Sequence, residues 1–102
     1  MVVIATIVPS SSQTVRCVVQ VSAEGNAFSV GGDLREFLAN RDHVSAHVRE
    51  MTVYFHAGIL TLNRLDAPVV VGVNGVAAGG GFSLVCMADL AIAARSARFN
   101  FA

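Results

Sequence analysis

Residues 25–34 read GNAFSVGGDL, and residues 74–81 read NGVAAGGG. Each stretch is a glycine-rich turn between an apolar run and a segment with helical spacing. Such a turn exposes backbone N–H groups at the start of a helix, where they can hold an anion or the negative oxygen of a carbonyl under attack. A structural turn is the simpler interpretation of either stretch alone, because glycine is the usual residue of tight turns. The presence of both turns in one short chain modestly favours a binding site over two purely structural turns.

Neither turn fits the common nucleotide-binding motifs. The phosphate-binding loop of nucleotide hydrolases ends in Gly-Lys-Ser/Thr, and neither turn contains a lysine. A dinucleotide fingerprint needs its three-glycine spacing directly after the first strand and an acidic residue about 20 positions later. The sequence lacks that arrangement. We therefore expect no nucleotide cofactor of these kinds.

The segment before the first turn has the period of a β-strand. Apolar residues at the odd positions of 15–21 alternate with Arg16, Gln20 and Ser22, which predicts a strand whose odd-numbered side chains face the core. After the turn, Asp33 is placed to cap a short helix. This helix would stop at a polar break formed by Asn40, Arg41 and Asp42.

The rest of the chain continues an order of strand, helix, strand, helix, strand. A long helix is expected from residue 44 to about residue 65, and Pro68 prevents its continuation. Branched apolar runs predict buried strands over residues 69–73 and 90–94, with a helical segment over 82–87 between them. The long helix carries an apolar stripe at steps of three and four, formed by Val44, Val48, Met51, Phe55, Ile59 and Leu62.

The composition limits the classes of partner. The chain has 102 residues, enough for one domain or a piece of one. Only 14% of its residues are charged, against roughly 25% in a typical soluble chain, so we expect surfaces buried against other chains or against a missing half. Seven basic and seven acidic residues cancel, which argues against nucleic acid and anionic membranes as partners. No run approaches the roughly 18 apolar residues of a membrane span, so we expect a cytoplasmic protein.

The cysteines and histidines do not suggest a metal site. Cys17 and Cys86 each lie in an apolar run, which predicts buried thiols and no need for an oxidising compartment. His43 and His47 are four residues apart, but no third ligand is apparent, so a solvated helix face is the simpler interpretation. His56 lies next to Phe55 on the long helix and is interpreted as a boundary residue rather than a catalytic base.

The two turns and their flanks resemble the two signatures of the crotonase, or enoyl-CoA hydratase/isomerase, superfamily. The second signature extends from Ala67-Pro68 through the 74–81 turn and Ala88-Asp89-Leu90 to Ala97-Arg98-Phe99. The resemblance covers the amino-terminal part of that family's core and implies an α/β fold of the crotonase type (ClpP/crotonase-like), a truncated spiral of strand-strand-helix units. It also implies homo-oligomers, usually trimers or hexamers. We divide the chain into an atypical segment, 1–14, and a partial core domain, 15–102.

The resemblance further implies a coenzyme A thioester as substrate, such as an acyl-CoA or enoyl-CoA, with no separate cofactor. The thioester oxygen would accept hydrogen bonds from the backbone N–H groups of Gly32 and Gly80, forming an oxyanion hole. Polarising that carbonyl stabilises an enolate and lowers the barrier to chemistry beside it. The backbone around Ala27, Phe28 and Val30 resembles the edge that receives the adenine end of coenzyme A.

The proton-transfer group is not evident. Hydratases of the family carry a glutamate two residues after the glycine triplet, where Ser83 stands, and a second one immediately after the position of Ala102. Ser83 is therefore a candidate substrate contact, and it lacks the activating base and the Gly-x-Ser-x-Gly elbow of a nucleophile. This difference slightly favours an isomerase over a two-glutamate hydratase. Asp33 resembles the acid that follows the first turn in the family, where it caps the helix.

Three functions remain open. The first is an acyl-CoA isomerase or hydratase whose remaining half lies outside this sequence, and the second is a non-catalytic module that binds acyl-CoA. The third is an inactive truncated remnant, because the family's hairpin and helix have no counterpart in the pattern of residues 1–14. Truncation would uncover apolar strand edges and the long helix, so we expect self-association.

Overall fold

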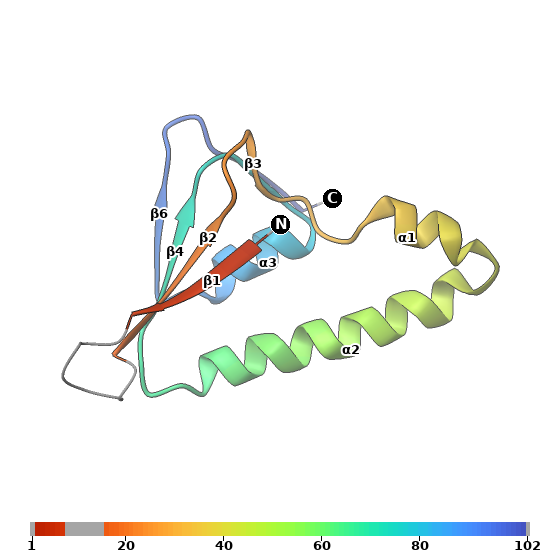
Figure 1. The fold of residues 1–102 in the computed structure, drawn as a ribbon, viewed down its shortest axis with the longest axis horizontal. Coiled ribbons are helices and arrows are strands. Elements are labelled where there is room, and N and C mark those ends of the chain that lie inside the picture. Colours follow the sequence, from red (N-terminus) through yellow and green to blue (C-terminus); the bar gives the residue numbers. More distant parts are fainter. Residues whose placement is uncertain (1, 8–15, 102) are drawn as a thin grey trace.

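The computed structural model describes residues 2–7 and 16–101. Figure 1 shows strands gathered at one end, with a long helix reaching away from them and a short helix beside its far end. In chain order the elements are β1 (Val2–Ile7), β2 (Cys17–Ser22), β3 (Ala27–Ser29), α1 (Leu34–Ala39), a 3-10 turn (Arg41–His43), α2 (Val44–Asn63), β4 (Val69–Val73), β5 (Val76–Ala78), α3 (Gly80–Met87), β6 (Leu90–Ala93) and β7 (Arg98–Asn100).

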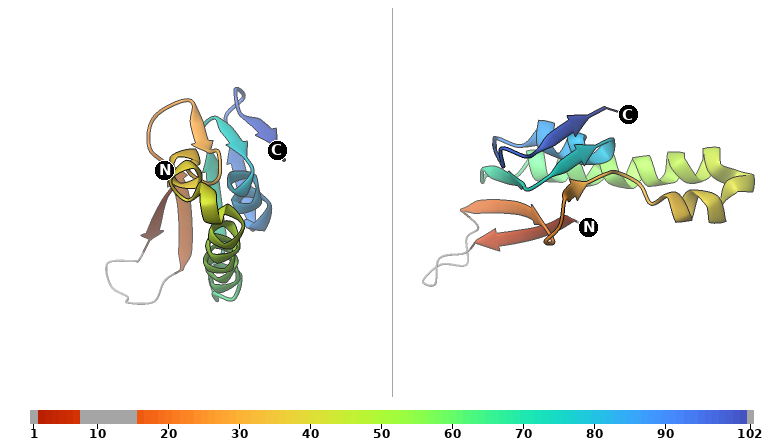
Figure 2. Two further views of the ribbon diagram at one scale, coloured as in Figure 1. Left: turned by 90° about the vertical axis from the view of Figure 1, so that its right-hand side faces the viewer. Right: turned by 90° about the horizontal axis from the view of Figure 1, so that it is seen from above.

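The strands form two sheets, and from β2 onward successive strands belong alternately to the first and the second sheet. The first sheet has the order β1-β2-β4-β6, and the second has the order β3-β5-β7. β2, β4 and β6 are parallel, as are β3, β5 and β7, whereas β1 is antiparallel to β2. Each successive pair of strands therefore adds one strand to each sheet, and helices follow the first two pairs (Figure 2). This is the strand-strand-helix spiral that the family resemblance implies.

The second sheet was missed by the sequence prediction. Its strands β3 and β5 lie inside the glycine-rich stretches that were interpreted as turns, and β7 follows the last predicted strand. Each has three residues, too few to display the alternation by which a strand is recognised. The pairing Ala27↔Val76 and Ser29↔Ala77 joins the two glycine-rich stretches directly.

The core lies between the sheets and the helices that pack on them. It contains Val18, Phe28, Val69, Val71, Val73 and Ala77. The predicted orientation of β2 is wrong, because Val18 and Gln20 are buried while Val21 is 37% exposed. β2 is paired on both sides and carries apolar residues on both faces, so alternation alone could not select the buried face.

Two further burial predictions are wrong. β6 is a strand, but its four residues are exposed because it forms the edge of the first sheet. Cys86 is exposed on α3, whereas Cys17 is half-buried. The apolar neighbours of Cys86 in the sequence did not predict its burial correctly, because α3 is covered only on the side that faces the core.

α1 and α2 begin where the sequence predicts, whereas α3 (Gly80–Met87) begins two residues before the predicted start at residue 82. Asp33 caps α1, since its Oδ1 accepts a hydrogen bond of 2.8 Å from the backbone N–H of Arg35. α2 begins at Val44 and ends at Asn63. Its apolar stripe is half-buried from Met51 onward, but Val44 and Val48 are 42% and 39% exposed. The amino-terminal part of α2 reaches beyond the sheets, so only its carboxyl-terminal part can pack on them (Figure 1).

The first predicted segment, 1–14, lies partly outside the described residues. Residues 2–7 form β1, which pairs along its length with β2, and residues 8–15 are not described. The sequence does not indicate this strand, because a mostly apolar run without alternation fits a helix as well as a strand. Over the described ranges, no helix is both long and apolar enough to cross a membrane.

Candidate functional site

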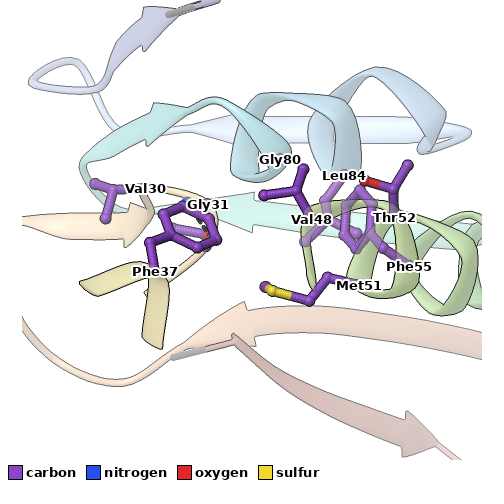
Figure 3. Close-up of a pocket in the computed structure, with 11 residues that line it drawn as sticks. Val30, Gly31, Phe37, Val48, Met51, Thr52, Phe55, Gly80 and Leu84 are labelled. Atoms are coloured by element: carbon purple, nitrogen blue, oxygen red, sulfur yellow. Dashed lines mark hydrogen bonds between the residues drawn. The ribbon is translucent and has the colours of Figure 1, made fainter. Parts of the chain in front are cut away.

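A cavity of about 530 Å³ opens where the two glycine-rich stretches meet the helices. Its walls come from the segment after β3, the start of α3, and one face each of α1 and α2 (Figure 3). The lining residues are Ser29, Val30, Gly31, Gly32, Phe37, Val48, Met51, Thr52, Phe55, Gly80 and Leu84. None of these side chains is ionisable, so the cavity is an apolar space with backbone groups and two hydroxyls as its polar atoms.

The two glycine-rich stretches are in contact at Gly31 and Gly80. A Cβ at Gly31 would lie 3.2 Å from the amide nitrogen of Gly80 and 3.6 Å from the carbonyl oxygen of Ala78. Gly31 also has a φ of 92°, a conformation that favours glycine. The hydroxyl of Ser29 accepts a hydrogen bond of 3.4 Å from the N–H of Gly31. Glycine is therefore required at position 31 for both space and conformation.

Two glycines of the second stretch bring it against β3. A Cβ at Gly81 would collide with the carbonyl oxygen of Ser29, and one at Gly75 would collide with that of Asn26. The backbone N–H of Val76 donates a hydrogen bond of 3.0 Å to the same carbonyl of Asn26. These close approaches set the separation of the stretches, because neither backbone could move away without breaking the β3–β5 pairing.

Two polar residues of the second signature hold strands together. The side-chain amide of Asn74 donates to the carbonyl of Gly25 at 3.1 Å, which ties β4 to the start of the first turn. The backbone N–H of Val69 donates to Oδ2 of Asp89 at 2.7 Å, and the N–H of Asp89 donates back to the carbonyl of Val69 at 2.9 Å. Both residues have structural roles outside the lining of the cavity.

The structure brings three of the sequence-predicted site residues to the cavity. Gly32, Gly80 and Val30 line it, and Val30 is 63% exposed. Phe28 is fully buried in the core, so a ligand could reach only its backbone. Ala27 and Ser83 are exposed and are not among the residues that line the cavity.

Sequence reasoning missed the wall opposite the glycines. This wall contains Phe37 from α1 and Met51, Thr52 and Phe55 from α2, together with Leu84 from α3. Met51 and Phe55 belong to the apolar stripe that the sequence predicts for the long helix, but the sequence does not indicate that this stripe borders a cavity. Periodicity shows that residues share a helix face, whereas the tertiary structure decides whether that face meets a core or a cavity.

The charged groups near the site lie outside the cavity. The side chain of Arg35 donates to the carboxylate of Asp33, and this hydrogen bond lowers the pKa of Asp33 and raises the pKa of Arg35. The exposed position of Asp33 and its bond to the Arg35 backbone support the capping role. Within residues 2–7 and 16–101, no group of three metal-ligating side chains is present.

The solvated interpretation of the histidines holds only in part. Of the two histidines interpreted as solvated, His43 is exposed, but the His47 side chain is only 20% exposed and makes an edge contact with the ring of Phe37, with 6.3 Å between ring centroids. His56, which was interpreted as a boundary residue, is exposed. The Nε2 atom of His47 is 3.6 Å from Oε2 of Glu36. His47, on α2, therefore packs against α1, where its ring contacts the ring of Phe37 that lines the cavity.

Comparison with known proteins gives the family. The model of the family described as enoyl-CoA hydratase/isomerase matches residues 4–102. A 1,2-epoxyphenylacetyl-CoA isomerase of Escherichia coli is 39% identical over 92 residues, which cover 87% of this chain and 34% of the isomerase. A 4-chlorobenzoyl coenzyme A dehalogenase of an Arthrobacter species is 35% identical over 80 residues, covering 78% of this chain and 29% of the dehalogenase.

Solved structures show the same fold. An enoyl-CoA hydratase of Mycobacterium smegmatis matches with a TM-score of 0.75 and 38% identity, covering 87% of this chain and 34% of the hydratase. An enoyl-CoA hydratase/isomerase structure from Mycobacterium abscessus matches with a TM-score of 0.76 and 37% identity, covering 88% and 35% of the respective chains. The chain spans about a third of the length of these relatives. Because the signatures, the spiral of strand-strand-helix units and the family match agree, this chain belongs to the enoyl-CoA hydratase/isomerase family, within the crotonase superfamily.

Proposed function

We propose that the cavity binds the acyl part of a coenzyme A thioester and that the backbone N–H groups of Gly32 and Gly80 hold the thioester oxygen. The observation that carries this proposal is the convergence of two glycine-rich stretches, far apart in sequence, on one apolar cavity. The largely apolar lining of the cavity has few polar groups that could compete for a developing negative oxygen, so donors preorganised there bind it more strongly than free donors in water would. Such an oxyanion hole would favour the enolate form of the thioester.

With the thioester oxygen at Gly32 and Gly80, the acyl and adenine parts of the substrate can be placed as well. The apolar wall formed by Met51, Phe55 and Leu84 suits an uncharged acyl group, because burying a charge there without a partner would be costly. We place the adenine end of coenzyme A along the backbone around Ala27, Phe28 and Val30. No separate cofactor enters this proposal, since coenzyme A is part of the substrate.

Between the reactions of the family, an isomerase-like proton shift is slightly favoured over hydration by two glutamates. The support is Ser83, which stands where the hydratases carry their first glutamate and is exposed outside the cavity lining. A second candidate function is binding of acyl-CoA without turnover. The support for this function is that no ionisable side chain from the described residues lines the cavity.

The test is to incubate the purified chain separately with a 2-enoyl-CoA and a 3-enoyl-CoA in deuterated water and to identify the products by mass spectrometry. A shifted double bond that carries deuterium supports the isomerase, and a product containing one added water supports the hydratase. Saturable binding without any product supports the non-catalytic module. Absence of binding to either thioester would contradict the proposal.

A proline variant isolates the Gly80 donor. α3 begins at Gly80, and the first position of a helix tolerates proline, so Gly80→Pro removes the N–H while leaving the helix possible. Gly80→Ala is the matched control, because a Cβ there would lie at an ordinary 3.5 Å from Cζ of Phe55 and the N–H is kept. We expect the proline variant to bind thioester at least about tenfold more weakly than the alanine variant, the size of one lost charge-assisted hydrogen bond.

We also propose that the chain is a cytoplasmic homo-oligomer, a trimer or hexamer as in the family. Exposed apolar side chains on the first sheet support self-association, since Leu90 and Ile92 are 55% and 62% exposed. Sedimentation equilibrium measures the assembly. A monodisperse monomer at working concentrations would contradict the oligomer proposal and leave the ligand proposal intact.

A further inference from the structure

Thr52 on α2 places a hydroxyl in the cavity lining that has no hydrogen-bond partner among the described residues. A threonine inside a helix can bond the carbonyl oxygen four residues earlier. Thr61 on the same helix does so, because its hydroxyl donates to the carbonyl oxygen of Ala57 at 2.8 Å. Thr52 makes no such bond to Val48. Its hydroxyl is therefore available to a ligand.

The surroundings of Thr52 in the cavity are apolar. Val48 and Phe55 lie one helical turn before and after it on the same face of α2, and Met51 lies beside it. Leu84 on α3 also lines the cavity, and Figure 3 shows the oxygen of Thr52 turned toward it. The hydroxyl of Thr52 is thus the one polar side-chain group that α2 contributes to the lining.

The position of Thr52 along α2 indicates which part of an acyl chain it could reach. Phe55 lies beside Gly80, since a Cβ on that glycine would be 3.5 Å from Cζ of the ring. Thr52 precedes Phe55 by three residues, about 4.5 Å along the helix axis. With the thioester oxygen at Gly80, Thr52 would therefore face the acyl chain a few carbons beyond the thioester carbonyl.

We propose that Thr52 is a specificity-determining residue that donates a hydrogen bond to an uncharged oxygen at carbon 4 or 5 of the acyl group. The favoured substrates are then acyl-CoA thioesters with an oxo group or a similar acceptor at that position. A plain hydrocarbon chain laid against Thr52 would displace water from its hydroxyl and leave it unpaired, whereas an acyl oxygen replaces that water. Thr52 is exposed in the free chain, so the gain is that of one net hydrogen bond.

The inference rests on the proposed function of the cavity, and titrations of the full chain with three ligands test the two separately. Hexanoyl-CoA is the plain ligand, and 4-oxohexanoyl-CoA and 5-oxohexanoyl-CoA have the same chain with one added carbonyl. Isothermal titration calorimetry gives each Kd. The quantity compared between variants is the oxo preference, defined as the Kd of hexanoyl-CoA divided by the Kd of the tighter oxo ligand.

Thr52→Val keeps the branched shape and removes the hydroxyl. We expect it to lower the oxo preference by about threefold to tenfold, the effect of one net hydrogen bond on an affinity. Hexanoyl-CoA should bind this variant no more weakly than it binds the unchanged chain, because no contact with the hydrocarbon is lost. Thr52→Ser keeps a hydroxyl and should retain the oxo preference.

Two other hydroxyls supply the controls. Thr61→Val removes a hydroxyl from the same helix, outside the cavity lining and already bonded within α2, so it should leave the oxo preference unchanged. Ser29 has the other hydroxyl of the lining, which accepts the N–H of Gly31. Ser29→Ala should also leave the oxo preference unchanged if Thr52 is the donor.

The outcomes separate the two ideas. If the unchanged chain binds none of the three thioesters, the proposed function fails and this inference fails with it. If the thioesters bind and Thr52→Val has the same oxo preference as the unchanged chain, only the role of Thr52 is overturned. A preference lost in Ser29→Ala but kept in Thr52→Val also overturns it, because the donor is then Ser29. A preference lowered in Thr52→Val alone and retained in Thr52→Ser supports the assignment.

Discussion

The Cβ that Gly31 lacks would lie 3.2 Å from the amide nitrogen of Gly80. These glycines are far apart in sequence, and the β3–β5 pairing brings their backbones together beside the cavity. The contact places the end of one glycine-rich turn against the first residue of α3. A side chain at position 31 would therefore disturb the Gly80 donor directly.

We expect Gly31→Ala to destabilise the fold by about 1–3 kcal/mol and to weaken thioester binding by at least about tenfold. The φ of 92° strains any residue with a Cβ, and the added methyl group would press on Gly80. Gly25→Ala is the control, because Gly25 has a φ of 143° but nothing within 4 Å of its Cβ position. Urea unfolding and acyl-CoA titration measure the two effects. Equal binding by the two variants would show that crowding at Gly80 does not matter.

Gly81→Ala should destabilise the fold by about 3 kcal/mol or more, because its methyl group would collide with the backbone carbonyl of Ser29, which cannot rotate away. Gly58→Ala provides the opposite case. Gly58 lies inside α2 with nothing within 4 Å of its Cβ position, so alanine should stabilise the chain by about 0.5–1 kcal/mol through helix propensity. Thermal unfolding of both variants measures the two effects. Similar changes in Tm for Gly81→Ala and Gly58→Ala would contradict the close packing of Gly81 against Ser29.

Asp89→Ala should cost about 1–3 kcal/mol of stability, since it leaves the buried N–H of Val69 without its 2.7 Å bond to the carboxylate. Asp66→Ala changes an exposed aspartate in the loop before β4 and should stay within about 0.5 kcal/mol of the unchanged chain. Amide hydrogen exchange at Val69 gives a local readout. Unchanged protection of that amide in Asp89→Ala would refute the assigned role.

The carboxylate of Asp33 should titrate below its ordinary value of 3.8, because the side chain and then the backbone N–H of Arg35 donate hydrogen bonds to it. A pKa lowered in the folded state means that the contribution of Asp33 to stability is present above about 3.8 and is lost as the pH falls through the folded value. Carboxyl ¹³C chemical shifts against pH measure the midpoint.

Replacement of the partner tests the cause of that shift. Arg35→Ala should raise the midpoint of Asp33 only part of the way to its ordinary value, because the backbone N–H still donates. Arg41→Ala removes an exposed guanidinium outside this hydrogen bond and should leave the midpoint in place. If the midpoint is unchanged in Arg35→Ala but shifts in Arg41→Ala, the shift comes from the overall charge of the surroundings and not from the hydrogen bond to Arg35.

Much of the local structure could be predicted because its causes are local. Asp33 caps α1, α2 begins at Val44, and a helix opens at the 79–81 glycine triplet, as the residue types and spacing indicate. Three-residue strands such as β3 leave no such signal, since they exist only through partners elsewhere in the chain. The buried face of β2 was predicted wrongly for a related reason, because the segments that pack on the faces of the sheet, and not the residues of β2, decide which face meets the core.

The two glycine-rich stretches, the capping residues, the helix periodicity and the family signatures can all be recognised from the sequence, because each depends on neighbours along the chain. The tertiary structure places Gly31 against Gly80, the rings of Phe37 and Phe55 beside Gly32 and Gly80, and part of the α2 stripe along a cavity. The contacts of Gly80 with Gly31 and with Phe55 join segments tens of residues apart. Their geometry follows from strand pairing and helix packing, which no local pattern of residues encodes.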